Sequence, residues 1–216
     1  MGTQILLLVM AYLFGSLPTG YIIGRLGGID IREHGSGSTG ATNVWRTVGK
    51  KAGILVFSID LLKGLLSVLL MKSAFAVSIW LSPFMPTTYN SNLQELFIVG
   101  AAMMALLGHT RSVWLGFKGG KAVASGLGVL LGLNWVVAIA AFGLWLLTMA
   151  IWRTVSISSI LAAIAAPILM TITQSPVSYN AFALIAGSYV VWLHRSNIER
   201  LRQGTEPTLF NSPSSD

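Results

Sequence analysis

Long uncharged apolar segments alternate with short polar segments along most of the chain. No charged side chain occurs in residues 1–24, 122–152 or 154–193. Because a membrane-spanning helix needs about 20 mostly apolar residues, the pattern predicts a first span over 1–24. Further spans are predicted over 52–71, over 96–107 and within the two other uncharged segments. A cleaved signal peptide is the alternative for residues 1–24, but this segment lacks a basic start and is too long.

Two of the apolar segments contain turn-forming residues near their middle. Residues 132–134 (GLN) interrupt the segment 122–152, and residues 174–176 (QSP) interrupt the segment 154–193. Since Gly, Asn and Pro favour turns, each segment is predicted to hold two helical pieces. For 122–152 these are either two short helices or one span with a re-entrant piece. Residues 81–94, rich in Pro, Thr and Asn, are predicted to form an irregular loop.

The basic residues give the predicted topology. Twelve of the 14 Lys and Arg residues fall into four groups, at 25–51, 111–121, 153 and 195–202. Cytoplasmic loops carry an excess of Lys and Arg, and an even number of spans must separate any two cytoplasmic groups. The chain is therefore predicted to be an all-α integral membrane protein with seven transmembrane helices, its N-terminus outside and its C-terminus cytoplasmic. One membrane domain is expected over 1–206, followed by a flexible tail over 207–216.

The composition agrees with this assignment and excludes several classes of protein. Hydrophobic residues make up 54% of the chain and charged residues 10%, against about 45–50% and about 25% in soluble domains. The absence of Cys excludes disulfides and cysteine-based zinc sites. We expect no metal, no cofactor, no nucleic acid and no obligate protein partner. The net charge of +7 is attributed to cytoplasmic loops and to an anionic substrate.

The first polar loop is rich in glycine and hydroxyl side chains. Residues 35–43 read GSGSTGATN, and Arg46 follows. Glycines let several backbone N–H groups converge into a nest that binds phosphate, and the Arg guanidinium is a planar fork that suits the same anion. A flexible interfacial turn is the alternative. The candidate phosphate ligands of this loop are Ser36, Gly37, Thr42, Asn43 and Arg46.

A second loop places a diglycine between two lysines. Residues 117–121 read FKGGK, and an apolar segment follows. Lys121 either extends to lipid headgroups, as interfacial lysines commonly do, or contacts a phosphate together with Gly119 and Gly120. Because two such loops are predicted on one face of the membrane, we favour a polyanion site.

Three further polar pairs are spaced three residues apart. Ser156 and Ser159 share one helix face, although hydroxyls in membrane helices commonly bond to the backbone. His194 and Asn197 share the face of a helix that leaves the membrane. A third pair, Asp60 and Lys63, lies deep in the second span, where charges are costly. We favour a structural ion pair there over a proton relay.

These motifs, in this order, resemble those of the bacterial integral-membrane glycerol-3-phosphate acyltransferases that use acyl phosphate, the PlsY family. The matching segments are AYLFGS at 11–16, GSGSTGATN at 35–43 with Arg46, GH at 108–109, FKGGK at 117–121, VSISS at 155–159 and HRSNIERL at 194–201. Residue 38 is Ser where the family usually has Asn, and residue 122 is Ala where Gly is common. Neither departure removes a charged residue of the motifs.

The resemblance implies a seven-helix enzyme of the bacterial plasma membrane, with its active site on the cytoplasmic side. Its substrates would be acyl phosphate and glycerol 3-phosphate, in contact with membrane lipids. The resemblance assigns Ser36, Arg46 and Lys121 to phosphate, and it assigns Ser159, His194 and Asn197 to glycerol phosphate. The catalytic candidates are Arg46, Lys121 and His194.

Acyl phosphate arrives activated, so orientation and charge neutralisation suffice and no acyl-enzyme is expected. Either His194 or the substrate phosphate takes the proton of the attacking hydroxyl. We favour the phosphate, with His194 donating a hydrogen bond to an anion. A transporter of organic phosphates is the rival function, and it would require polar residues across the midplane, where the sequence offers only Asp60 and Lys63. A structural lipid-binding protein would leave the two glycine-rich loops unexplained.

Overall fold

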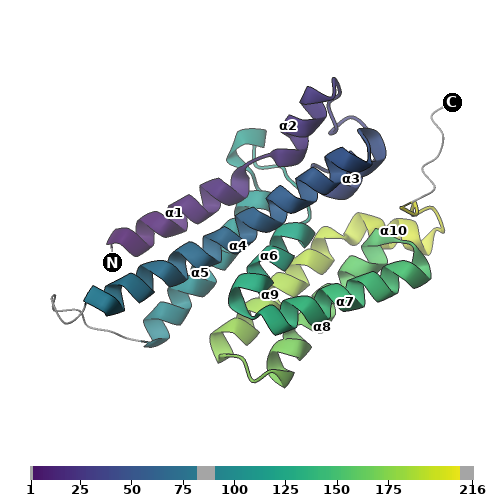
Figure 1. Ribbon diagram of the computed structural model, residues 1–216. Helices are drawn as coiled ribbons and strands as arrows, with labels where there is room; N and C mark the ends of the chain where they lie inside the picture. The colour runs from purple at the N-terminus through teal and green to yellow at the C-terminus, as the bar shows by residue number, and fades with distance from the viewer. Residues whose placement is uncertain (1, 82–90, 210–216) are drawn as a thin grey trace.

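The computed structural model describes residues 2–81 and 91–209, and in this part of the chain helices joined by loops are the only regular secondary structure (Figure 1). The helices are α1 (Gly2–Ser16), α2 (Thr19–Leu26), α3 (Ala41–Thr47), α4 (Lys50–Leu81), α5 (Ser91–Thr110), the 3-10 helix η1 (Val113–Leu115), α6 (Val123–Leu133), α7 (Trp135–Trp152), α8 (Val155–Ile172), α9 (Val177–Leu193) and α10 (Arg195–Arg202).

Several helices have the length and composition of membrane spans, which confirms an all-α integral membrane protein. Five segments of the described chain are long and apolar enough to cross a bilayer: Gly2–Leu26, Lys50–Trp80, Ser91–Leu115, Trp135–Trp152 and Val155–Ile172. The apolar helices α6 and α9 are shorter. At 1.5 Å per residue, α6 rises about 16 Å, roughly half of the bilayer's hydrocarbon core.

Both predicted interruptions of the apolar segments are confirmed as helix ends. Between α6 and α7, the Asn134 side chain accepts hydrogen bonds from the backbone N–H groups of Val136 and Val137. Its amide also donates to the hydroxyls of Thr173 and Ser175, at 3.1 and 2.9 Å. One side chain therefore caps α7 and ties this turn to the turn between α8 and α9.

Other predicted segments differ in detail. The predicted first span corresponds to the candidate span Gly2–Leu26, but its helix is interrupted at Pro18, which lacks the N–H group that a helix interior needs: α1 ends at Ser16 and α2 begins at Thr19. Within the predicted loop 81–94, residues 91–94 belong to α5, and residue 81 ends α4. Residues 82–90 lie outside the described part of the chain. The tail was expected to be flexible from residue 207, but residues 207–209 pack against the protein, as shown below, and 210–216 are not described.

Helix α4 is the central element of the packing. It contacts α1, α3, α5 and α6, while α7, α8 and α9 pack on one another in sequence. The approach of α4 to α6 depends on small residues, because a side chain at Gly128 would collide with the Leu61 backbone, and one at Gly64 with the Ser125 backbone. Close contact between small residues is a common way for membrane helices to associate.

The predicted pair inside α4 is confirmed as an ion pair. Lys63 Nζ lies 2.8 Å from Asp60 Oδ1, and both side chains are almost fully buried. Lys63 also donates to the carbonyl of Leu17, which the break between α1 and α2 leaves free of helical partners (3.0 Å). His109 of α5 lies beside the pair, with Nδ1 3.8 Å from Asp60 Oδ1. This charge cluster joins α1, α4 and α5 at one depth.

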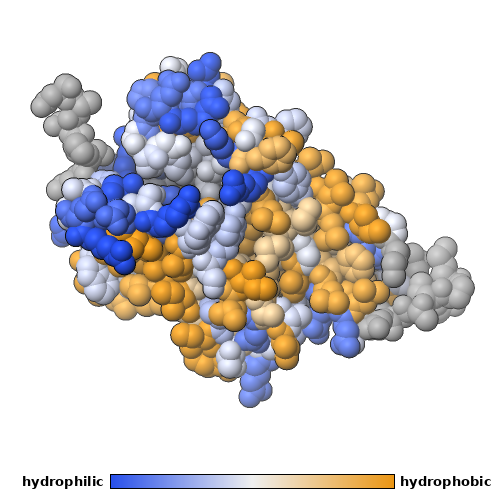
Figure 2. Space-filling view, turned by 180° about the vertical axis from the view of Figure 1, so that it is seen from behind, coloured by the Kyte–Doolittle hydropathy of each residue, from blue (hydrophilic) through white to orange (hydrophobic). Residues whose placement is uncertain are grey.

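The polar segments gather at one end of the molecule. Figure 1 shows α2, α3 and α10 at the end opposite the N-terminus and the turn between α8 and α9. Figure 2 shows hydrophilic surface concentrated at one end and apolar surface over much of the remaining face. The loops that carry the candidate residues are therefore neighbours in space.

Candidate active site

A cavity of about 410 Å³ opens among α3, α4, α6, α7, α8 and α9. Its polar part is lined by residues of the first loop, by Lys121, by the start of α8 and by residues of the C-terminal segment from His194 onward. Its apolar part is lined by aromatic and small side chains: Phe57, Leu127, Leu130, Phe142, Trp145, Ala162, Ala163, Ala166, Phe182, Ala183, Ala186 and Gly187. The cavity therefore offers polar, partly cationic surface at one region and a hydrocarbon-like surface at the other.

Asn43 holds the first loop in shape. Its amide donates to the carbonyls of Ile31, His34 and Ser38 at 2.9–3.1 Å, and its Oδ1 accepts from Ser36 N–H at 3.0 Å. Asn43 is buried and lines the cavity, but these bonds occupy its amide within the loop. The geometry assigns it to the construction of the loop that carries Ser36 and Thr42, both of which line the cavity.

Arg46 projects from α3 toward the C-terminal segment. Its Nη2 donates to the carbonyls of Pro207 and Thr208, at 3.1 and 3.3 Å. Its Nε is buried and has no hydrogen-bond partner among the described residues. Burial lowers the pKa of this guanidinium, which nevertheless stays charged at neutral pH. A buried guanidinium with an unused donor is suited to bind an anion.

Lys121 lies directly before α6 and donates a hydrogen bond to Asn197 Oδ1 of α10. Burial, together with the nearby cations Arg200, Arg46 and Arg195, lowers the pKa of Lys121 to about 8, while Glu206 opposes the shift. The ammonium is therefore held in a place where positive charge is already concentrated. An anionic ligand would relieve this repulsion.

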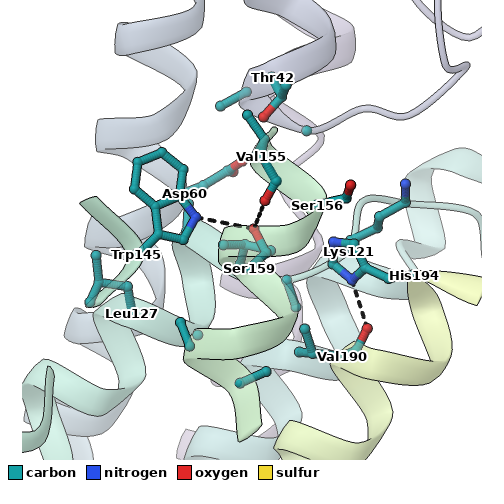
Figure 3. Close-up of a pocket in the computed structure, with 18 of the residues that line it drawn as sticks. Thr42, Asp60, Lys121, Leu127, Trp145, Val155, Ser156, Ser159, Val190 and His194 are labelled. Atoms are coloured by element: carbon teal, nitrogen blue, oxygen red, sulfur yellow. Dashed lines mark hydrogen bonds between the residues drawn. The ribbon is translucent and has the colours of Figure 1, made fainter. Parts of the chain in front are cut away.

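His194 lies at the end of α9, close to Lys121 and Ser156 in Figure 3. Its Nδ1 lies 2.7 Å from the Val190 carbonyl, and since a carbonyl can only accept, Nδ1 carries the hydrogen. Burial lowers the pKa of His194 to about 4, so the ring is neutral at pH 7 and Nε2 is an acceptor. The predicted donation from His194 to an anion would need a proton on Nε2, whereas the neutral tautomer suits a ligand hydroxyl.

The two serines of α8 lie in different surroundings. Ser159 Oγ donates to the Val155 carbonyl at 2.8 Å and accepts from Trp145 Nε1 at 3.2 Å (Figure 3). Its one proton is therefore bonded to the backbone, as hydroxyls in membrane helices commonly are. Ser156 is buried, and its hydroxyl helps to lower the pKa of the Glu206 carboxyl.

Three predicted glycines do not line the cavity, namely Gly37, Gly119 and Gly120. A side chain at Gly119 would collide with the backbone of His109, and one at Gly120 would collide with the His109 ring. The diglycine therefore lets the loop pack closely on α5, and this places Lys121 at the cavity. Gly37 has a φ of 66°, which residues with a side chain rarely adopt.

Sequence reasoning did not assign to the site five residues that line the cavity, namely Trp45, His109, Trp145, Arg200 and Glu206. Asp60, predicted only as half of an ion pair, lines the cavity too. Arg200 and Glu206 follow the HRSN motif closely, and this spacing is the one signal that could have indicated them. Within residues 2–81 and 91–209, no group of three or more His, Asp or Glu side chains is arranged to hold a metal ion.

Comparisons with known proteins agree on one family. The family model for glycerol-3-phosphate acyltransferase matches residues 5–204. A glycerol-3-phosphate acyltransferase of Acaryochloris marina is 50% identical over 94% of this chain and 91% of its own length. One from a Synechococcus strain is 50% identical over 96% and 95%.

Solved structures agree with the sequence relatives. The chain is similar to crystal structures of PlsY, an integral membrane glycerol 3-phosphate acyltransferase, at 36% identity and with 95% of each chain covered. The TM-score is 0.84 for the glycerol 3-phosphate form and 0.81 for the lysophosphatidic acid form.

The role of Asn43 leads to a stability prediction. Asn43→Ala should lower the midpoint of thermal unfolding in detergent, because it leaves four backbone groups of the loop without their partner, each loss costing roughly 1 kcal/mol or more. Asn43→Asp should be at least as destabilising, since a carboxylate would then face three carbonyl oxygens. Ser38→Ala, which removes one 3.3 Å hydrogen bond in the same loop, is the control. Wild-type unfolding of both Asn43 variants would contradict the assignment.

Proposed function

This chain belongs to the glycerol-3-phosphate acyltransferase family and is an acyltransferase, and from this premise we propose that its acyl donor is acyl phosphate. The 1-hydroxyl of sn-glycerol 3-phosphate attacks the acyl carbon, the bond from that carbon to the phosphate oxygen breaks, and inorganic phosphate leaves. The products are lysophosphatidic acid and phosphate. The proposal places this reaction in one domain over residues 1–206, extended to 209 by the contacts of the C-terminal segment.

The observation that carries the proposal is the composition of the cavity. Arg46, Lys121 and Arg200 line one part of it, and aromatic and alanine side chains line the rest. Both substrates carry a phosphate, and one also carries a long hydrocarbon chain. A single cavity with these two surfaces accommodates both substrates, whereas a transporter would need polar residues leading to a second opening.

The substrate roles follow from donor and acceptor chemistry. Arg46 and Lys121 neutralise phosphate, and the hydroxyls of Ser36, Thr42 and Ser156 donate hydrogen bonds to it. Asn197 and the neutral His194 face the glycerol, and His194 Nε2 accepts a hydrogen bond from its hydroxyl. A ring with a pKa of about 4 is a weak proton acceptor. The phosphate of glycerol 3-phosphate, whose second pKa is about 6 by analogy with phosphoserine, therefore takes the proton of the attacking hydroxyl. Ser159, Gly37, Gly119, Gly120 and Asn43 support these groups.

Replacing the lysine should remove most of the activity. Lys121→Ala should lower kcat/KM roughly 100-fold or more, the size of effect seen when one charge-stabilising donor is removed, while the protein stays folded. Lys118→Ala is the matched control, because Lys118 is exposed in the same loop and does not line the cavity. Turnover of Lys121→Ala equal to that of the control would place the phosphate site elsewhere.

The same lysine predicts the pH dependence. Its pKa lies at about 8, so above this pH the free enzyme loses the ammonium and kcat/KM should fall about tenfold per pH unit. Bound phosphate favours the charged form, so the alkaline limb of kcat should lie at higher pH than that of kcat/KM. Coincident limbs would show that the titrating group does not contact the substrate.

Transfer should be direct. The Ser159 proton is bonded to a backbone carbonyl, and among the described residues no hydrogen bond joins His194 Nε2 to a serine hydroxyl, so the site holds no activated pair of nucleophile and base. Enzyme mixed with palmitoyl phosphate alone should release no phosphate, and mass spectrometry should detect no acyl-serine. Palmitoyl-CoA should not serve as donor, because the cavity offers no evident place for its nucleotide. One equivalent of phosphate released without glycerol 3-phosphate would overturn direct transfer.

We also propose that α6 and α9 complete seven membrane passes, with the N-terminus outside and the active site facing the bacterial cytoplasm. Single cysteines test this cleanly, since the chain has no Cys. Gln174→Cys should react with an impermeant maleimide in intact cells, and Lys118→Cys and Gln203→Cys should react only after lysis. All three side chains are exposed. Asn90, also expected outside, is not among the described residues. Labelling of Lys118→Cys from outside would refute the orientation.

A further inference from the structure

The chain after α10 returns across the polar part of the cavity. Glu206 Oε1 accepts a hydrogen bond from Asn197 Nδ2 at 2.6 Å, and Oε2 accepts one from Arg200 Nε at 2.7 Å. Only 4% of the Glu206 side chain is exposed. Directly after it, the carbonyls of Pro207 and Thr208 accept from Arg46. Glu206 is therefore built into the site and is not part of a solvated tail.

We propose that Glu206 is a positioning residue for the acyl transfer: its carboxylate determines which way the Asn197 amide points, and Asn197 in turn holds the Lys121 ammonium at the phosphate site. The inference rests on the proposed function, because it takes Lys121 as a phosphate ligand. Glu206 acts through Asn197 and Lys121 and touches neither substrate.

The argument begins with the chemistry of the Asn197 amide. An ammonium can only donate hydrogen bonds, and a carboxylate can only accept them. An amide placed between Lys121 and Glu206 satisfies both in one orientation alone, with Oδ1 toward Lys121 and Nδ2 toward Glu206, as is found. Without the carboxylate, the amide loses the partner that excludes the reversed orientation.

The second step concerns charge. The ionisable groups that act on Lys121 are Arg46 of α3, Arg195 and Arg200 of α10, and Glu206, and the neutral His194 lies beside it. Glu206 is the one acid among them, and it raises the pKa of Lys121 whereas the three arginines lower it. Burial by itself would raise the pKa of Glu206, but the hydrogen bonds from Asn197 and Arg200 help to keep it below its usual value. The carboxylate is therefore charged at neutral pH, where Lys121 is charged as well.

Two variants separate the hydrogen bonds from the charge. Glu206→Gln keeps nearly the same shape, but its amide can accept only one of the two bonds and carries no charge. It should lower kcat/KM for glycerol 3-phosphate by roughly 10- to 100-fold, as misplaced binding groups do, and should move the alkaline limb to lower pH. Glu206→Asp keeps the charge and shortens the side chain, so it should lower kcat/KM but retain the wild-type alkaline limb.

The matched control is Glu199→Gln. Glu199 is exposed on α10, and its carboxylate accepts a hydrogen bond from Gln203 Nε2. This variant removes the same charge from α10, seven residues before Glu206, and should keep both the rate and the pH profile. Thermal unfolding in detergent is measured for all variants, so a loss of folded protein is recognised.

The measurement is the pH profile of kcat/KM between pH 6 and pH 10, with palmitoyl phosphate saturating. A wild-type alkaline limb in folded Glu206→Gln would overturn the proposal. If Glu206→Gln does not fold, a wild-type kcat/KM in Glu206→Asp would overturn it instead. A lower KM for glycerol 3-phosphate in Glu206→Gln would also overturn it, because Glu206 would then be an anion that competes with the substrate for the same cations.

The proposed function is tested by the wild-type arm of the same experiment. If wild-type protein does not transfer palmitate from palmitoyl phosphate, the proposed function fails before any variant is compared. If wild type is active and Glu206→Gln behaves as Glu199→Gln does, the proposed function stands and the role of Glu206 is wrong.

Discussion

The repulsion among partly buried cations at the mouth of an apolar cavity is the constraint on which the site depends. Arg46, Lys121 and Arg200 come from three separate parts of the chain and line one space. Positive charges in a region of low dielectric constant repel one another strongly and are costly to desolvate. Such a cluster needs anions, and Glu206 supplies one from the chain itself. The buried Nε–H group of Arg46 has no acceptor among the described residues, which indicates that the cluster still has an excess of positive charge and of donors. This excess favours the binding of a phosphate.

The packing of the helices fixes the positions of these charged side chains. Small residues let α6 lie directly against α4, and the diglycine lets the loop before α6 lie against His109 of α5. The Asp60–Lys63 pair and the carbonyl of Leu17 join α4 to the break after α1. Lys121 thus lies directly before a short helix that is packed closely on α4, in a loop that is itself packed closely on α5. Preorganised charge of this kind stabilises a transition state without reorganisation during the reaction.

Much of this arrangement could be predicted from the sequence, because it follows from local signals. The long apolar segments predicted the spans, and the GLN and QSP interruptions predicted two helix ends. The i,i+3 spacing predicted the Asp60–Lys63 pair. The roles of Asn43 and Glu206 could not be predicted in this way. Asn43 bonds to carbonyls 5 to 12 residues earlier in the chain, and the contacts of Glu206 depend on how the segment after α10 returns. A Pro/Ser-rich end suggests a tail by composition, and only the folded chain shows that its first residues lie over the site.

The neutral state of His194 and the reduced pKa of Lys121 have the same cause, since burial disfavours the charged form of both side chains. The two side chains differ in their hydrogen-bond partners and in the charged groups near them. His194 donates its Nδ1–H group in a hydrogen bond to the Val190 carbonyl. Its Nε2 atom remains an acceptor facing the cavity, which suits a hydroxyl group. Lys121 has Asn197 and Glu206 nearby and stays cationic up to a pH of about 8, which suits a phosphate. A molecule that carries a hydroxyl and a phosphate a few bonds apart therefore matches these two adjacent side chains, because His194 is a neutral acceptor and Lys121 is a cationic donor.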